Sequence, residues 1–195
     1  MLFMKYLTPN NMFLVLEYLM VLIKGKILGI DYVIKYLRNP NPKLNRKILK
    51  EFGAKIGKNS TIKRSLFLDN TWEDENSRGD FSNLIIGENC YIGDDCYFDL
   101  ACKIEIRNNS VISGRVSIIT HSDCNRSIFL SKRFPRKCEA VLISEGAWIG
   151  FNSTILSGIT IAENSIIGAN SLVTRDNSIN SIFAGSPAKK LSDIL

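Results

Sequence analysis

The sequence predicts a mainly β fold in which short strands coil into a parallel β-helix behind an N-terminal helical arm. Three observations predict it: an aliphatic residue recurs at every sixth position, Asn or Asp often follows three positions later, and a small residue follows four positions later. An α-helix would carry every sixth residue around its surface and bury no coherent face. Short strands separated by tight corners fit this period instead.

The period is strictest in the C-terminal part of the chain. Its aliphatic positions are Ile143, Ile149, Ile155, Ile161, Ile167, Val173 and Ile179. Small side chains would let successive coils stack closely, and they include Ala147, Ser153, Ser165 and Ser171. Asn and Asp best tolerate the left-handed backbone conformation of a tight corner. The corner residues are Asn152, Asn164, Asn170 and Asp176.

The same pattern occurs upstream in three runs. Their apolar positions are Ile56, Ile62 and Leu68, then Ile86, Ile92, Phe98 and Ile104, then Ile106, Ile112 and Ile118. We therefore expect the β-helix to cover residues 54–180, with loops near 70–81 and 121–140. Residues 1–53 would form the helical arm, and 181–195 a C-terminal tail.

The arm is predicted to form short helices. Asn10 or Asn11 can cap one that ends near Gly25, and another can run from Asn41 to Gly53. The first helix carries an apolar stripe of Phe13, Leu16, Met20 and Ile23. This stripe must be covered, either by the adjoining domain, by another subunit or by a membrane surface.

The charge of the chain is concentrated in the same arm. Residues 1–50 hold nine Lys and Arg against Glu17 and Asp31, a net charge of +7, whereas the remainder is −1. This balance allows peripheral membrane contact through residues 1–50, or simply a solvated helix face. Binding of nucleic acid is disfavoured, because basic and aromatic residues do not alternate along the part of the chain that follows the arm.

No membrane-spanning segment or signal peptide is predicted. The most apolar stretch, Met12 to Ile23, is shorter than the roughly twenty residues that a crossing needs, and it contains Glu17. Lys24 and Lys26 stand where a signal peptide would need small residues. We expect a cytoplasmic protein.

The five cysteines predict neither a disulfide framework nor a zinc site, because they are odd in number and include no CxxC pair. Cys90, Cys96 and Cys102 each occupy the small position of a repeat, which predicts a packing role. Cys124 and Cys138 lie in the second loop, where a free thiol and a packing role stay open.

Four segments together resemble the hexapeptide-repeat acyltransferases, which include the maltose, galactoside and exopolysaccharide O-acetyltransferases. The segments are Gly146 to Gly150, Gly158 to Ile161, Ile167 to Asp176 and Gly185 to Lys189. The resemblance covers about residues 54–192. It implies a left-handed parallel β-helix, a homotrimer with active sites between neighbouring subunits, and acetyl-CoA as acyl donor without a metal.

The resemblance also implies a catalytic base. His121 is the only histidine of the chain, and it lies where the repeats break into the second loop. In the family, a histidine at this place removes the proton of the acceptor hydroxyl during direct transfer, and imidazole suits that task near neutral pH. Cys124, three residues away, is the competing candidate as a nucleophile.

Further site residues follow from the resemblance alone. Asp99 matches a polar residue that faces the acceptor. The positions that match the family's acetyl-CoA site are Trp148, Gly150, Phe151, Ala169, Thr174, Arg175, Lys189 and Lys190. Gly93 stands where the galactoside enzymes carry an acceptor-binding asparagine, and this departure argues against simple galactosides.

The leading functional interpretation is O-acetylation of a sugar hydroxyl in surface polysaccharide or lipopolysaccharide biosynthesis. N-acylation of an amino sugar or nucleotide sugar uses the same fold and base, and a noncatalytic binding β-helix is a third possibility. The carbonic anhydrases that share this fold need three histidines for zinc, so a single histidine excludes them.

Overall fold

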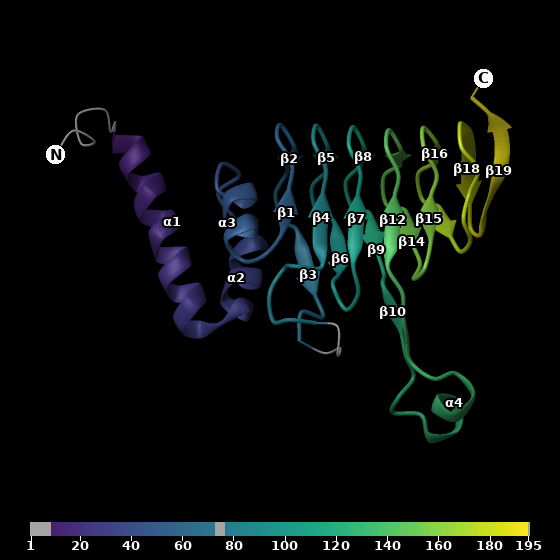
Figure 1. The fold of residues 1–195 in the computed structure, drawn as a ribbon, viewed down its shortest axis with the longest axis horizontal. Helices are drawn as coiled ribbons and strands as arrows, with labels where there is room; N and C mark the ends of the chain where they lie inside the picture. Colours follow the sequence, from purple (N-terminus) through teal and green to yellow (C-terminus); the bar gives the residue numbers. More distant parts are fainter. Residues whose placement is uncertain (1–8, 73–76, 195) are drawn as a thin grey trace.

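The computed structural model describes residues 9–72 and 77–194, and shows a β-helix with an N-terminal arm and a projecting loop (Figure 1). The arm consists of α1 (Pro9–Leu28), α2 (Ile30–Leu37) and α3 (Asn45–Glu51). The loop between the coils contains β10 (His121–Ser122), α4 (Ile128–Arg133) and β11 (Lys137–Cys138).

The coiled strands stack into three sheets, which we call A, B and C, and the chain visits them in this order on each coil as far as β17. Sheet A consists of β1 (Lys55–Ile56), β4 (Leu84–Ile86), β7 (Ile104–Ile106), β12 (Val141–Ile143) and β15 (Thr160–Ile161). Sheet B consists of β2 (Thr61–Ile62), β5 (Tyr91–Ile92), β8 (Val111–Ile112), β13 (Trp148–Ile149), β16 (Ile166–Ile167), β18 (Ser181–Gly185) and β19 (Ala188–Asp193). Sheet C consists of β3 (Phe67–Asp69), β6 (Tyr97–Asp99), β9 (Ser117–Ile118), β14 (Thr154–Ile155) and β17 (Leu172–Val173).

The core of this left-handed parallel β-helix is the aliphatic position of each repeat. In sheet B, Ile112, Ile149 and Ile167 pair in parallel register on successive coils, and each is fully buried. The alternation within each two-residue strand points one side chain inward and the other outward, as strand geometry requires. The predicted period of six is confirmed as far as Val173.

The corners follow the prediction for most of the coil. Asn152, Asn164 and Asn170 have positive φ, as expected. Stacked corner amides also hydrogen bond along the coil, as where Asn152 Nδ2 donates to Asn170 Oδ1 at 2.8 Å. Thus one residue type serves both the backbone conformation and the contact between coils.

The prediction was wrong at the last repeat. Asp176 is not among the residues with positive φ, and Ile179 is 62% exposed. The chain leaves the regular path after β17, and the side chains of Asp176 and Asn177 accept the backbone N–H groups of Thr160 and Ala162, both at 2.8 Å. Two side chains therefore pair with the open edge of sheet A in place of another strand.

Residues 181–195, expected as a tail, instead extend the coil as far as they are described. β18 pairs in parallel with β16, and β19 folds back antiparallel on β18. The expectation failed because these residues leave the period of six, which was the signal used to recognise strands.

Four of the five cysteines fall into two groups, and Cys124 is a half-buried free thiol in the loop. Cys90 and Cys96 are buried in the coil, and burial raises the pKa of the Cys96 thiol to about 12. Cys102, which we expected only to pack, forms a disulfide with Cys138 across a Cα–Cα distance of 5.9 Å. The two residues are 36 positions apart, and only the return of the chain into sheet A brings them together.

The arm closes the N-terminal end of the coil. Ile48 and Leu49 of α3 are fully buried, and Asn45 donates to the backbone carbonyl of Lys63 at 2.8 Å. α1 extends beyond Gly25, where an added Cβ would lie 2.5 Å from the ring of Phe52, so glycine permits close approach of the helix. The structure places Asn10 and Asn11 inside α1 rather than at its cap, and α2 was not foreseen.

The core supports a stability prediction with a matched control. Ile167→Ala should lower the free energy of unfolding by about 2–5 kcal/mol, because it leaves a cavity between stacked coils. Ile179→Ala, the same change at the exposed position of the same period, should change it by about 0.5 kcal/mol or less. Urea denaturation followed by circular dichroism measures both, and equal losses would contradict the assigned core.

Candidate active site

His121 lies at the edge where sheet C turns into sheet A and where the chain leaves the coil for its long loop. Its side chain is 22% exposed. β10, which His121 opens, pairs with β11, and the disulfide from Cys102 to Cys138 ties β11 to the preceding coil. The base of the loop is thereby fixed beside the histidine.

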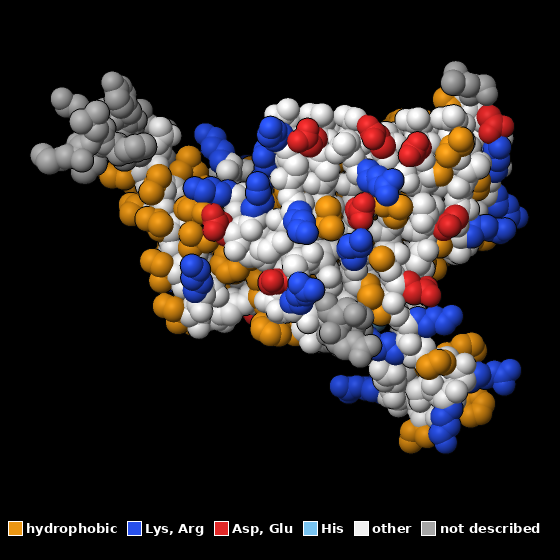
Figure 2. Space-filling model, viewed as in Figure 1, with side chains coloured by type: hydrophobic (Ala, Val, Ile, Leu, Met, Phe, Trp, Pro, Cys, Tyr) orange, Lys and Arg blue, Asp and Glu red, His pale blue; other side chains and the backbone are white. Residues whose placement is uncertain are grey.

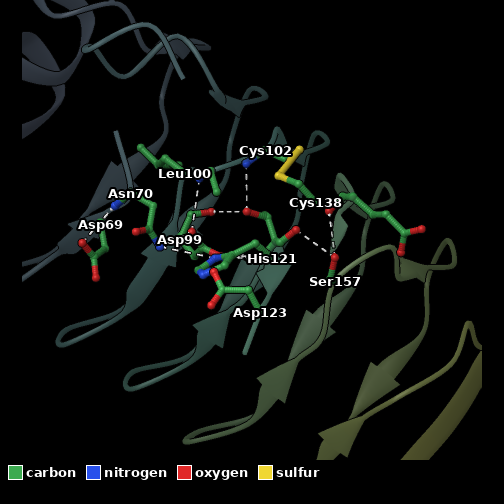
Figure 3. Close-up of polar contacts among 12 residues, drawn as sticks. Asp69, Asn70, Asp99, Leu100, Cys102, His121, Asp123, Cys138 and Ser157 are labelled. Carbon is green, nitrogen blue, oxygen red and sulfur yellow. Dashed lines mark hydrogen bonds and ion pairs between the residues drawn. A yellow bond between two sulfur atoms is a disulfide. The ribbon is translucent and has the colours of Figure 1, made fainter. Parts of the chain in front are cut away.

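Asp99 is the principal partner of His121 (Figure 3). It ends β6, one coil earlier on sheet C, and its Oδ2 lies 2.6 Å from His121 Nδ1. The same oxygen accepts the backbone N–H groups of Thr120 at 2.8 Å and His121 at 3.0 Å. The carboxylate therefore holds both the ring and the backbone of the histidine.

The other oxygen of Asp99 is also engaged. Oδ1 accepts from the side chain of Asn70 at 2.8 Å and from the backbone N–H of Ala101 at 3.2 Å. Burial alone would raise the pKa of Asp99, but the hydrogen bonds from Asn70, His121, Thr120 and Ala101 outweigh it and bring the pKa below its ordinary value. The ionised form is the one that this environment favours.

Acceptor binding, the role we expected for Asp99, does not fit this position. The residue has 0% exposure, and both of its carboxylate oxygens are occupied by protein donors. A carboxylate in this setting has no accessible surface to offer to a sugar. It is placed instead to orient the imidazole.

Asn70 completes the cluster, and the sequence analysis gave it no role. Its side chain donates to Asp99 and lies 3.4 Å from His121 Nδ1. It directly follows β3, so Asn70, Asp99 and His121 stand at the same edge on three successive coils. The signal in the sequence that could have grouped these residues is their common place: each ends or follows a strand of sheet C.

A pocket of about 250 Å³ opens beside His121. Its other lining residues are Ile119, Ser122, Lys137, Glu139, Leu156, Ser157 and Thr174. Ser157 is fixed by donating its hydroxyl to the carbonyl of Thr120 at 2.8 Å. Of the predicted acetyl-CoA residues, Thr174 therefore lines the same pocket as His121 within one chain. Arg175, the next residue, is exposed.

The remaining predicted acetyl-CoA residues lie elsewhere on the coil. Trp148 points outward from sheet B, while Gly150, Phe151 and Ala169 form the edge where sheet B turns into sheet C. Gly150 is itself buried, and an added Cβ would lie 2.5 Å from the backbone nitrogen of Ala169. Glycine is therefore required there by the stacking of the coils. Within one chain, the edge between sheets B and C is separate from the edge between sheets C and A that carries His121.

Lys189 and Lys190 belong to β19 at the C-terminal end of sheet B, where both are exposed. Lys190 forms an ion pair with Asp193 at 2.6 Å. Within residues 9–72 and 77–194, no group of three or more His, Cys, Asp and Glu is arranged to hold a metal ion.

The environment of Asp99 gives a pH prediction. Because its folded pKa is below the ordinary value of 3.8, the ionised carboxylate stabilises the protein above that value. This stabilisation is lost as the pH falls toward the lowered pKa. Asp99→Asn should therefore cost about 1–3 kcal/mol at neutral pH, and less as the pH falls below about 4.

Urea denaturation of the wild-type and Asp99→Asn proteins over a series of pH values measures this difference. Groups that titrate alike in both proteins cancel in the subtraction. A difference that stays constant down to the acid limit would show that Asp99 is not held in its ionised form.

Comparison with known proteins agrees with this architecture. Residues 140–175 match the family model described as bacterial transferase hexapeptide (six repeats), and residues 83–118 match the hexapeptide repeat of succinyl-transferase. Both matched segments lie within the coil.

Among curated relatives, the chain is 28% identical to the galactoside O-acetyltransferase of Escherichia coli, over 75% of this chain and 67% of the relative. It is 29% identical to a putative colanic acid biosynthesis acetyltransferase of Escherichia coli, over 72% of this chain and 70% of the relative. A putative acetyltransferase of Saccharomyces cerevisiae is 32% identical over 58% of this chain, which spans only 57% of that relative's length.

Solved structures share the fold over nearly the whole chain. A maltose O-acetyltransferase from Clostridium difficile superposes with a TM-score of 0.72 at 26% identity, covering 90% of this chain and 89% of the other. A galactoside acetyltransferase in complex with coenzyme A gives 0.71 at 26% identity, with 89% and 80% covered. In its repeats, its coil and these relatives, the chain is similar to the hexapeptide-repeat acyltransferases.

Proposed function

We propose that the protein transfers an acetyl group from acetyl-CoA to a sugar hydroxyl, with His121 as general base. The observation that carries this proposal is the buried Asp99 carboxylate, 2.6 Å from His121 Nδ1, beside a pocket that the histidine lines. The O-acetyltransferases among the relatives support the reaction, and the structural neighbour with bound coenzyme A supports the donor.

The pairing with Asp99 sets the chemistry of the imidazole. An ionised carboxylate only accepts hydrogen bonds, so Nδ1 carries the hydrogen and the lone pair stays on Nε2. Nε2 takes the hydroxyl proton while the acceptor oxygen attacks the thioester carbonyl. When the tetrahedral intermediate collapses, the C–S bond breaks and the CoA thiolate recovers that proton. Asp99 stabilises the transient imidazolium, as the carboxylate does in the Ser-His-Asp arrangement.

A cysteine nucleophile is less well supported. The thiol of Cys124 contacts the backbone carbonyl of Phe134 within the loop at 3.4 Å. His121 directs Nδ1 to Asp99 rather than to this thiol. Direct transfer without an acyl-enzyme therefore fits the arrangement of these groups better.

The separation of the predicted site residues over two edges supports a site between subunits. In a closed trimer with parallel coils, the edge that carries His121 in one subunit can face the edge with Phe151 and Ala169 in its neighbour. Sheet B also exposes an apolar row of Tyr91, Val111 and Trp148 in register on successive strands. A neighbouring subunit would cover such a row.

The acceptor that we propose belongs to surface polysaccharide or lipopolysaccharide assembly, since one relative is named for colanic acid biosynthesis. Polar groups of Lys137, Glu139 and Ser157 in the pocket could hold sugar hydroxyls. N-acylation of an amino sugar would use the same base, and an acceptor panel separates the two reactions. The cytoplasmic location stays a prediction.

The test of the base is CoA release from acetyl-CoA in the presence of sugars, amino sugars and nucleotide sugars. His121→Ala should lower kcat by about 10²–10⁴-fold, because the acceptor hydroxyl loses its proton acceptor. Acetyl-CoA binding, measured by calorimetry, should persist. Blank reactions without acceptor correct for the protein's own cysteines, and full activity of the variant would contradict the assignment.

The test of the shared site is complementation between inactive chains. His121→Ala and Phe151→Asp change different edges, and Phe151 is exposed enough to accept a charge without unfolding. Each variant alone should be inactive. The co-expressed population should regain about one quarter of the wild-type activity, because random assembly pairs a native His121 edge with a native Phe151 edge at about one site in four. Activity no higher than that of the parents would place each site within one chain.

A further inference from the structure

α1 presents a broad apolar surface to solvent. Its inner face packs on the rest of the arm through Leu14, Val21 and Gly25. The large apolar residues that remain exposed on α1 are Met12, Phe13, Val15, Leu16, Leu19, Met20, Ile23, Ile27 and Leu28. Hydrophobic side chains line the outer side of this helix in Figure 2, at the end of the molecule away from the coil. A helix that is apolar on all sides is ordinarily covered on all sides.

The one acidic residue of α1, Glu17, lies at the margin of that surface and is held by neutral hydrogen-bond donors. Glu17 accepts the hydroxyl of Tyr36 at 2.7 Å and the amide of Asn41 at 3.2 Å. These contacts hold the carboxylate against α2 and the segment that follows it. From Asn11 to Ile23, no charged side chain therefore interrupts the outer face.

A basic groove lies beside this apolar face. Lys43, Arg46, Lys47 and Lys50 follow a helical spacing along and just before α3, and with Glu51 they line a pocket of about 430 Å³. The Lys47 ammonium lies 3.7 Å from the ring centre of Tyr18 on α1. Lys43 also lines a second pocket, of about 280 Å³, together with Phe13 and Glu17 of α1. The apolar face and the basic groove are thus one continuous surface, which we call the α1–α3 surface.

We propose that the α1–α3 surface docks on an anionic lipid bilayer. The exposed face of α1 would enter the boundary between headgroups and acyl chains, and the four cations of the groove would contact lipid phosphates. No helix among residues 9–72 and 77–194 is long and apolar enough to cross a membrane, so α1 would lie in the plane of the interface.

A second copy of the chain and a nucleic acid each match only part of the α1–α3 surface. A second copy docked by the same patch would bring two sets of four cations against each other, which costs free energy. A nucleic acid would satisfy the cations but leave the apolar side chains of α1 in water. A bilayer with acidic headgroups matches both halves at once. The inference goes beyond acyl transfer and does not depend on it.

The experiment is flotation of the full chain with vesicles of phosphatidylcholine alone, or of phosphatidylcholine with about one third phosphatidylglycerol. The wild-type protein should bind the acidic vesicles at least about ten-fold more tightly, and high salt should weaken binding. Ile23→Glu, at a position that is 58% exposed, should lower binding to the acidic vesicles at least about ten-fold. Arg46→Glu/Lys50→Glu should reduce it to the level seen with neutral vesicles.

Matched variants control for charge and folding. Ile179→Glu makes the same change at an exposed isoleucine at the other end of the coil, and Lys55→Glu/Lys58→Glu makes the same charge change outside the groove. Both should float like the wild type, and circular dichroism should show every variant folded. Absence of binding to acidic vesicles, or binding that Ile23→Glu leaves intact, would overturn the proposal. So would a change in oligomer size on Ile23→Glu without vesicle binding, which would identify a subunit interface.

Discussion

The structure depends on the parallel pairing of equivalent positions on successive coils. Each strand of two or three residues is too short to be stable by itself, and its backbone groups are satisfied only by the strands above and below. Once that register is set, the aliphatic side chains stack inward, the Asn corners stack at the edges, and glycine is required where one coil lies directly on another, as at Gly150. Repetition supplies the stability that no single coil has.

The same register assembles the candidate site. Asn70, Asp99 and His121 are far apart in sequence, yet they occupy one edge of three adjacent coils because each ends or follows a strand of sheet C. A hydrogen-bonded cluster needs positions fixed to within a fraction of an ångström, and a stacked coil fixes them through its backbone. The disulfide between Cys102 and Cys138 adds a covalent constraint at the point where the coil is interrupted.

Much of the fold could be predicted from the sequence because a period of six is a local signal that is repeated many times. The buried isoleucines and the Asn corners were found in this way, whereas Ile179 kept the period after the chain had left the coil. Asp99 was predicted as a site residue from the resemblance, but the side chain's contact with the imidazole rather than with solvent is a feature that the pattern does not reveal. The pairing of Cys102 with Cys138, and the place of Asn70, depend on contacts between segments joined by irregular loops.

At each end of the coil, one sheet finishes in side chains that hydrogen bond to its last regular strand, and this limits how the molecules can associate there. An open coil end exposes N–H and C=O groups that could pair with the next molecule and propagate an endless fibre. At one end Asn45 donates to the carbonyls of Ile62 and Lys63, and at the other Asp176 and Asn177 accept N–H groups of the final turn. Polar side chains thus occupy the edge of sheet B at the N-terminal end and of sheet A at the C-terminal end, and they disfavour end-to-end pairing of these two edges.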